Sequence, residues 1–191
     1  MKNGMQKTEE IIYPREKGSD FCDGVCRRSR VNVGYCWHCK CCSGGCPFAD
    51  SMDYLPNQVI RLVQLGMEEE ALTSSAIWIC VGCNTCSMEC PMAIDMASVM
   101  DVLRQMAREK GVKVGEPDIL NFHREVLDSI HRYGRTHKLE IMMRYKIRKR
   151  DWLSDMDVGI QMLSKRKLDL MPSKVEKIDV IRRLFKMTGE K

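Results

Sequence analysis

The sequence has no long run of apolar residues. No stretch approaches the ~18 consecutive apolar residues that a membrane-spanning helix needs, so we expect neither a membrane segment nor a membrane partner. The N-terminal stretch MKNGMQKTEEIIYPREKGSD is polar and mixed in charge, and it lacks the apolar segment of a signal peptide. These absences favour a cytoplasmic protein.

Motifs for substrate chemistry are also missing. We find no nucleotide-binding fingerprint, no flavin motif and no pairing of a nucleophile with a base. The sequence therefore indicates a protein that has no catalytic site of its own and whose chemistry takes place on a partner.

No segment alternates between apolar and polar residues as a half-buried strand does. Helix signals are common instead: Pro56 suits a first turn, Asp95 suits an N-cap, and Gly66 and Gly111 suit helix ends. The predicted helices cover 56–65, 67–75, 96–110, 117–133, 138–150, 157–168 and 174–187. We expect a mainly α fold class.

The residue type that stands out is cysteine, which occurs eleven times. Cytosolic thiols stay reduced, an odd number cannot pair completely, and tight C-x-x-C spacing suits a metal better than a disulfide framework. Ligation of a metal or cluster is therefore the favoured use of these cysteines.

One cysteine pattern occurs twice, with the spacing C-x2-C-x2-C-x3-C-P. The first copy reads CWHCKCCSGGCP from residue 36, and the second reads CVGCNTCSMECP from residue 80. Three thiolates in such a loop can bind three corners of an iron–sulfur cube, and in two-cluster ferredoxins the fourth cysteine ligates the other cluster. We therefore predict two [4Fe–4S] clusters with exchanged ligands. Cluster 1 is assigned Cys36, Cys39, Cys42 and Cys90, and cluster 2 is assigned Cys80, Cys83, Cys86 and Cys46.

A pair of structural zinc sites is the main alternative. Zinc is satisfied by four cysteines, typically from two C-x-x-C knuckles with a longer spacer. It needs neither a third cysteine at the next interval nor the closing proline. The complete pattern, present twice, favours clusters. The apolar residues expected to limit water access to them are Trp37, Phe48, Trp78, Ile79, Val81, Met88, Met92 and Ile94.

Three cysteines lie outside the predicted ligand sets. Cys41 directly precedes a ligand, and we expect it to be a spare thiol that faces the other way. Cys22 and Cys26 are either packing residues on a helix, which we favour, or ligands of a further metal shared with another subunit. His38 lies between two ligands, and we interpret it as a neighbour only, because all four cysteines of its motif are present.

Positive charge is concentrated in the second half of the chain. Residues 101–191 hold 22 Lys and Arg against 14 Asp and Glu, and residues 131–150 hold eight against one. Such a block is either a solvated helix face or a docking surface for an acidic partner. A zinc-stabilised nucleic-acid-binding protein is a remote alternative, because the block offers only Tyr133 and Tyr145 as aromatic readers. We expect no nucleic-acid partner.

The spacing of the two motifs resembles that of a known family. Cys36 and Cys80 are 44 residues apart, and the segment between them has a helical pattern. This arrangement resembles the α-helical ferredoxin domain, and over about residues 30–110 it is most similar to the C subunit of the soluble heterodisulfide reductase of methanogenic archaea. The similarity includes both motifs and the intervening LPNQVIRLVQLGMEEEALTSSAIWIC. It implies an N-terminal arm over 1–30, an α-helical ferredoxin domain with both clusters over 31–112, and a helical, basic C-terminal extension for subunit contacts over 113–191.

The resemblance also implies a function within a cytoplasmic oxidoreductase complex of three kinds of subunit. In that family, the A subunit carries flavin, and the B subunit carries the iron–sulfur site that reduces the coenzyme M–coenzyme B heterodisulfide in methanogenesis. The C subunit passes electrons between them, and a hydrogenase or formate dehydrogenase is an indirect partner. The alternative is an equivalent two-cluster relay in a glycerol-3-phosphate dehydrogenase or sulfur-oxidation complex.

Overall fold

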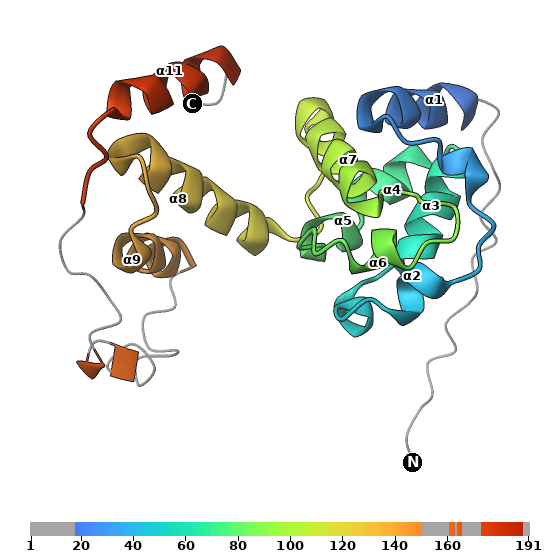
Figure 1. Ribbon diagram of the computed structural model, residues 1–191, viewed down its shortest axis with the longest axis horizontal. Coiled ribbons are helices and arrows are strands. Elements are labelled where there is room, and N and C mark those ends of the chain that lie inside the picture. The colour runs from blue at the N-terminus through green and yellow to red at the C-terminus, as the bar shows by residue number, and fades with distance from the viewer. Residues whose placement is uncertain (1–17, 150–160, 163, 166–172, 189–191) are drawn as a thin grey trace. The chain divides into compact units, whose positions relative to one another are not determined.

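The structure is a computed structural model that describes residues 18–149, 161–162, 164–165 and 173–188 (Figure 1). The described residues form helices, turns and connecting segments, and they include no strand. The mainly helical fold class predicted from the sequence is confirmed. The chain divides into two units, residues 1–115 and 116–191, and each is described by itself. No helix in the described part of the chain is both long and apolar enough to cross a bilayer.

The first unit contains both cysteine motifs. Its helical elements are, in chain order, α1 (Gly18–Ser29), η1 (Val33–Tyr35), α2 (Cys41–Gly44), η2 (Ala49–Ser51), α3 (Pro56–Gln64), α4 (Glu68–Thr73), α5 (Ala76–Ile79), α6 (Thr85–Met88) and α7 (Met96–Lys110). The helices predicted at 56–65, 67–75 and 96–110 are confirmed as α3, α4 and α7.

The ends of α3 and α7 follow from their sequences. Pro56 occupies the first turn of α3, where a missing N–H costs nothing. Asp95 caps α7, because its carboxylate accepts a hydrogen bond from the Ser98 N–H at 3.2 Å. Gly66 and Gly111 follow the two helices in the left-handed conformation, with φ of 68° and 62°. These four predicted signals are confirmed.

Helix α1 was not among the predicted helices. All of it lies in the segment 1–30 that we expected to be an N-terminal arm; Phe21 and Val25 are buried, and α1 packs on α3 and α7. The same core contains buried side chains from α3, α4, α5 and α7: Val59, Ile60, Val63, Leu72, Ile77, Val99, Met100 and Leu103. Burying one such side chain is worth about 1.5–3 kcal/mol, so this core fixes the helices that carry the cysteine loops.

Asp53, which follows the first motif in the sequence, forms hydrogen bonds to the start of the helix that precedes the second motif. Its carboxylate accepts hydrogen bonds from the N–H groups of Ser75, the N-cap of α5, and of Ala76, the first residue of α5, at 2.7 and 2.9 Å. Helix α5 leads directly into Cys80. We expect Asp53→Ala to lower the free energy of unfolding by about 1–2 kcal/mol, since capping interactions have this size. Urea denaturation of the anaerobic protein measures the loss, and Asp53→Asn, which keeps one acceptor, is expected to lose less.

The second unit contains α8 (Pro117–Tyr133), α9 (Lys138–Lys149) and α11 (Ile178–Thr188). The helix predicted at 117–133 is confirmed, and those at 138–150 and 174–187 are confirmed over most of their length. The helix predicted at 157–168 lies largely outside the described residues. Helices α8 and α9 pack together, and Phe122 meets Tyr145 edge-to-face at 5.7 Å.

Ion pairs connect α9 to α8. Glu125 of α8 is buried, and one of its carboxylate oxygens lies 2.6 Å from Arg148 Nε. Lys149 Nζ lies 3.4 Å from a carboxylate oxygen of Asp118. Within α9, Arg144 Nε lies 2.9 Å from a carboxylate oxygen of Glu140. Part of the basic block 131–150 therefore stabilises this helix pair.

Candidate iron–sulfur site

The two cysteine motifs adopt the same backbone conformation. In the first loop, His38 and Lys40 are left-handed, with φ of 56° and 68°. Gly82 and Asn84 occupy the equivalent positions of the second loop and are also left-handed, with φ of 64° and 62°. Left-handed residues next to right-handed ones turn backbone N–H groups toward one side, which makes the concave surfaces found at iron–sulfur and phosphate sites. The repeat in the sequence is thus a repeat in conformation.

A short helix follows each loop. The Lys40 carbonyl accepts a hydrogen bond from the Gly44 N–H at 3.0 Å, and the Asn84 carbonyl accepts one from the Met88 N–H at 3.0 Å. These bonds begin α2 and α6, which contact each other (Figure 1). The two motifs therefore lie side by side, although 44 residues separate them in the sequence.

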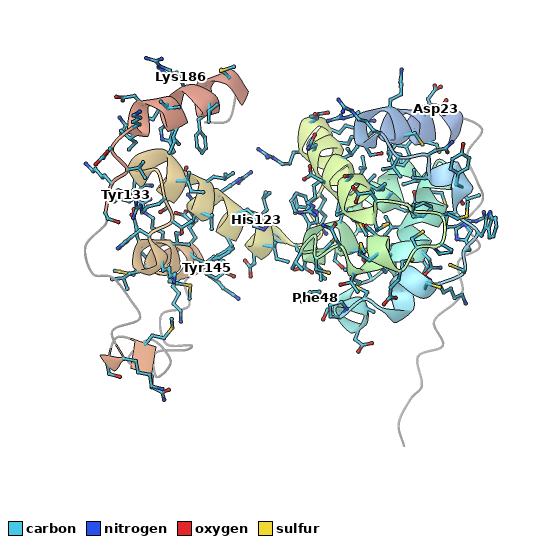
Figure 2. The ribbon with its side chains drawn as sticks, viewed as in Figure 1. Asp23, Phe48, His123, Tyr133, Tyr145 and Lys186 are labelled. Carbon is cyan, nitrogen blue, oxygen red and sulfur yellow. The ribbon has the colours of Figure 1, made fainter. Side chains whose placement is uncertain are left out.

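Four cysteines line a cavity beside the second motif, which we call the second-motif cavity. It holds about 400 Å³ of empty space, counting the part that opens to solvent. Its cysteines are Cys80, Cys83 and Cys86 of the second motif and Cys46 of the first. Most of the remaining wall is apolar and consists of Phe48, Met52, Pro56, Val81, Met96, Ala97 and Met100. Phe48 is labelled in Figure 2.

The first-motif cavity has the complementary set of cysteines. It holds about 300 Å³ of empty space on the same measure, and Cys36, Cys39, Cys42 and Cys90 line it. His38, Asn57 and Met92 are among the other lining residues. The structure thus brings together the two groups of four cysteines that were assigned to clusters 1 and 2 from the sequence. Ligation itself stays a prediction.

The described residues contain no group of three His, Cys, Asp or Glu side chains placed to hold a single metal ion. One zinc ion bound at about 2.3 Å from each sulfur requires its ligands to converge on a point. A cube binds one thiolate at each iron corner, so its ligands surround a larger group. The eight cysteines in question surround two cavities.

Burial and hydrogen bonds shift the pKa values of these thiols in opposite directions. Burial, reinforced by neighbouring thiols, raises the pKa of Cys86 to about 11, and burial also raises the pKa of Cys42. At the exposed rim, a hydrogen bond from the Thr85 hydroxyl lowers the pKa of Cys83. Hydrogen bonds from the backbone and from a neighbouring thiol lower the pKa of Cys39. Thiolates gathered this closely need positive charge between them, and iron can supply it.

A residue of α3 contacts the first cysteine loop, and a residue of α7 contacts the second. On α3, Gln64 donates through Nε2 to the Val33 carbonyl at 2.8 Å, and its Oε1 lies 2.7 Å from His38 Nε2. On α7, Arg104 donates to the Cys80 carbonyl at 3.2 Å. Neither residue was predicted from the sequence, because their contacts join residues 24 to 31 positions apart.

A polar pair connects α2 to α3. The Ser43 hydroxyl donates to Asn57 Oδ1 at 2.5 Å, and the Asn57 N–H donates back to that hydroxyl oxygen at 3.2 Å. Both residues are buried, and Asn57 lines the first-motif cavity. Buried polar groups with complete hydrogen bonding fix local geometry, so this pair positions the turn that follows Cys42.

Several apolar residues expected to shield the cysteines are exposed instead. Trp78 and Ile94 are buried as expected. Trp37 is 75% exposed, Val81 is 62% exposed and Met88 is 85% exposed; Trp37 and Val81 nevertheless line the cavities, whereas Met88 lines neither. Trp37 and Val81 occupy equivalent positions of the two motifs, directly after the first cysteine. The two cavities therefore each have an apolar side chain at their solvent edge.

The three remaining cysteines line neither cavity. Cys22 and Cys26 lie on α1 with their thiols hydrogen-bonded, and burial raises the pKa of Cys22 to about 11, with Cys26 adding to the shift. Cys41 is exposed, and a hydrogen bond to the Cys39 thiol raises the pKa of Cys41. Its thiol therefore faces that of a predicted ligand, which differs from the expectation that it turns away.

Comparisons with known proteins agree with a cluster site. The profile of the 4Fe–4S dicluster domain matches residues 32–94. The chain is 31% identical over 132 residues to the iron–sulfur C 2 subunit of CoB–CoM heterodisulfide reductase from Methanocaldococcus jannaschii, covering 65% of this chain and 67% of that protein. It is 30% identical over 106 residues to the iron–sulfur C subunit of CoB–CoM heterodisulfide reductase from Methanopyrus kandleri, covering 54% and 55%.

A third relative is the C subunit of the H2:CoB–CoM heterodisulfide, ferredoxin reductase from Methanothermobacter thermautotrophicus. It is 27% identical over 107 residues, which cover 56% of this chain and 58% of that protein. The chain thus spans between about half and two thirds of the length of these curated relatives. All three relatives are named as C subunits of a heterodisulfide reductase, and this chain contains the 4Fe–4S dicluster domain. The chain belongs to the family of heterodisulfide reductase C subunits, which are iron–sulfur electron-transfer proteins.

Proposed function

We propose that this protein relays electrons through two [4Fe–4S] clusters within a cytoplasmic heterodisulfide reductase complex. Electrons pass from a flavin-bearing subunit to a catalytic iron–sulfur subunit, where the coenzyme M–coenzyme B heterodisulfide is reduced in methanogenesis. A hydrogenase or formate dehydrogenase supplies them indirectly. Related proteins are named for hydrogen or for hydrogen and formate as donors, which supports this part of the proposal.

The observation that carries the proposal is the composition of the two cavities. Each combines three cysteines of one motif with the last cysteine of the other. The proposed ligands are Cys36, Cys39, Cys42 and Cys90 for cluster 1, and Cys80, Cys83, Cys86 and Cys46 for cluster 2. Exchange of the fourth ligand keeps two clusters close together, because each motif then contributes to both. Close spacing is what electron transfer between clusters requires.

Electron transfer through the clusters and reduction of the heterodisulfide have different requirements. Opening a disulfide consumes two electrons and two protons and releases two thiols. A [4Fe–4S] cluster, when bound, stores and passes one electron at a time. The residues of this chain would bind the iron through thiolates, exclude water with the apolar walls of the cavities, and donate hydrogen bonds to sulfur. Proton transfer and bond cleavage belong to the site on the catalytic iron–sulfur subunit.

The exposed apolar residues at the cavity edges suit contacts with partner proteins of the complex. Trp37 lines the first-motif cavity and Val81 lines the second-motif cavity, and both are more than half exposed. Aromatic and apolar side chains are favoured at the centre of protein interfaces. Two such edges provide one place for electrons to enter and another for them to leave, as a relay between two partners needs.

Relay in another complex, of the glycerol-3-phosphate dehydrogenase or sulfur-oxidation type, is the second candidate, and it uses the same clusters. Proteins that co-purify with the native chain distinguish the two. Nucleic-acid binding is disfavoured, because the basic block is partly paired with Glu125, Glu140 and Asp118. Nucleic-acid binding would weaken steeply with added salt.

The proposal predicts a measurable metal content. The chain purified without oxygen should contain about eight iron and eight sulfide per chain, as two [4Fe–4S] clusters require. Dithionite reduction should give spin-coupled cubane signals in low-temperature EPR. Affinity purification from a methanogen should recover a flavoprotein and a second iron–sulfur protein, and the recovered complex should reduce the heterodisulfide. Zinc without sulfide would overturn the assignment of iron–sulfur clusters. Partners from a different oxidoreductase would overturn the assignment to a heterodisulfide reductase complex.

A further inference from the structure

The first loop has a strained residue where the second loop has glycine. His38 and Gly82 are equivalent residues, and both are left-handed, with φ of 56° and 64°. Glycine adopts this conformation without steric cost, whereas a residue with a side chain loses about 1–2 kcal/mol. Strain of this kind persists where surrounding contacts fix it, and it is concentrated at functional sites. The contacts of the His38 side chain are therefore informative.

Gln64 fixes the His38 ring. The Gln64 Nε2 donates to the Val33 carbonyl at 2.8 Å, so its Oε1 is the atom that faces His38 Nε2, at 2.7 Å. Because that oxygen can only accept, His38 Nε2 carries the proton. Arg61 also donates to the same oxygen, at 3.4 Å. The imidazole is thus anchored to α3, whose position is fixed by the core.

The His38 backbone contacts a predicted ligand. Its N–H donates to the Cys36 sulfur at 3.4 Å, within the range of hydrogen bonds to sulfur. This sulfur is the atom that would bind iron. A donor at a ligand sulfur favours the reduced cluster, since that state carries one more negative charge, and such bonds are among the main determinants of cluster potential.

We propose that His38 is a positioning residue of cluster 1: its imidazole, anchored by Gln64, holds the left-handed turn that aims the His38 N–H at the Cys36 sulfur and thereby raises the reduction potential of that cluster. The inference rests on the proposed function for the presence of the cluster. Gly82 has no side chain to anchor, so the second loop lacks this device. The two clusters are therefore tuned differently at this one position, His38 in the first loop and Gly82 in the second.

Redox titrations followed by EPR test the proposal on the full chain with both clusters. In His38→Ala, which keeps the steric cost of the turn but removes the anchor, and in Gln64→Met, the reduction equilibrium of cluster 1 should move three- to tenfold toward the oxidised state, which is about 30–60 mV for one electron. Cluster 2 should keep its potential in both variants. Because both substitutions break the same hydrogen bond between His38 and Gln64, the potential of cluster 1 in the double variant should shift no further than in either single variant.

Two further variants separate anchoring from other effects. His38→Gln keeps an N–H donor for Gln64 and should restore most of the potential. Asn84→Gly relieves the equivalent strain in the second loop, where φ is 62°, and should leave cluster 1 unchanged. Unaltered potentials in both single variants, or shifts that add in the double variant, would overturn the inference. A wild-type protein without cluster signals would instead overturn the proposed function, so the two failures are distinguishable.

Discussion

Replacing Cys46 by serine should destroy the cluster of the second motif, although Cys46 belongs to the first motif. Cys46 lines the second-motif cavity with Cys80, Cys83 and Cys86. Loss of one thiolate from four leaves an iron corner without its strong ligand. We expect the iron content to fall from about eight to about four per chain, with the cluster 1 signal retained. Iron and sulfide analysis with low-temperature EPR measures the change.

Double variants make this test independent of which signal belongs to which cluster. Cys46→Ser combined with Cys83→Ser should lose no more iron than either substitution alone, because both act on one cluster. Cys46→Ser combined with Cys39→Ser should lose nearly all iron. Cys41→Ser is the matched control, since Cys41 lies in the same motif but lines neither cavity, and the serine hydroxyl can keep the hydrogen bond that the Cys41 thiol makes with Cys39. The opposite pattern, in which Cys46 behaves as a partner of Cys39, would refute ligand exchange.

The reciprocal variant tests the same exchange from the other motif. Cys90 lies in the second motif but lines the first-motif cavity. Cys90→Ser should therefore remove cluster 1 and leave the spectrum that Cys39→Ser leaves. Agreement of the two reciprocal results would establish that each motif supplies three ligands to one cluster and the fourth to the other.

Features that depend on local spacing could be predicted from the sequence. The cysteine pattern identified eight candidate ligands, and helix ends were identified by Pro56, Asp95 and Gly111 because capping is a short-range interaction. Helix α1 was missed for a related reason. Its apolar face consists of Phe21, Cys22, Val25 and Cys26, which is short, and half of it is cysteine; packing of the two cysteines on a helix was favoured, but the bounds of that helix were not predicted.

Features that depend on tertiary contacts could not be predicted. Gln64 is unremarkable as a polar residue near the end of α3, and its contact with His38 joins residues 26 positions apart. Trp37 next to a ligand was expected to exclude water, whereas the structure leaves it exposed. Hydrophobicity indicates that a side chain prefers to be covered, but a single sequence does not tell whether its own chain or a partner covers it.

The pKa shifts explain why the two loops should depend on iron for their order. Burial raises the pKa of Cys86 to about 11, so in the absence of iron this thiol stays protonated at neutral pH. This neutral thiol then makes only weak contacts across its cavity, because S–H is a poor donor and acceptor. The remaining support comes from pairs such as Ser43 with Asn57. Iron replaces these weak contacts with strong bonds that cross-link both motifs.

Removal of the clusters should therefore disorder the cysteine loops while leaving the second unit intact. Metal binding in structural sites contributes folding free energy, about 10–16 kcal/mol for structural zinc, so a cross-linking cluster should have a large effect as well. Hydrogen exchange followed by mass spectrometry, on the full chain under anaerobic reducing conditions, should show lost protection over 36–46 and 80–90 after chelation. Exchange in α8 is the internal control and should be unchanged, since Glu125 and Ser129 are buried within the second unit. Equal protection of both loops before and after chelation would mean that the polypeptide alone fixes the site, and iron would then be cargo in a preformed cavity instead of a structural cross-link.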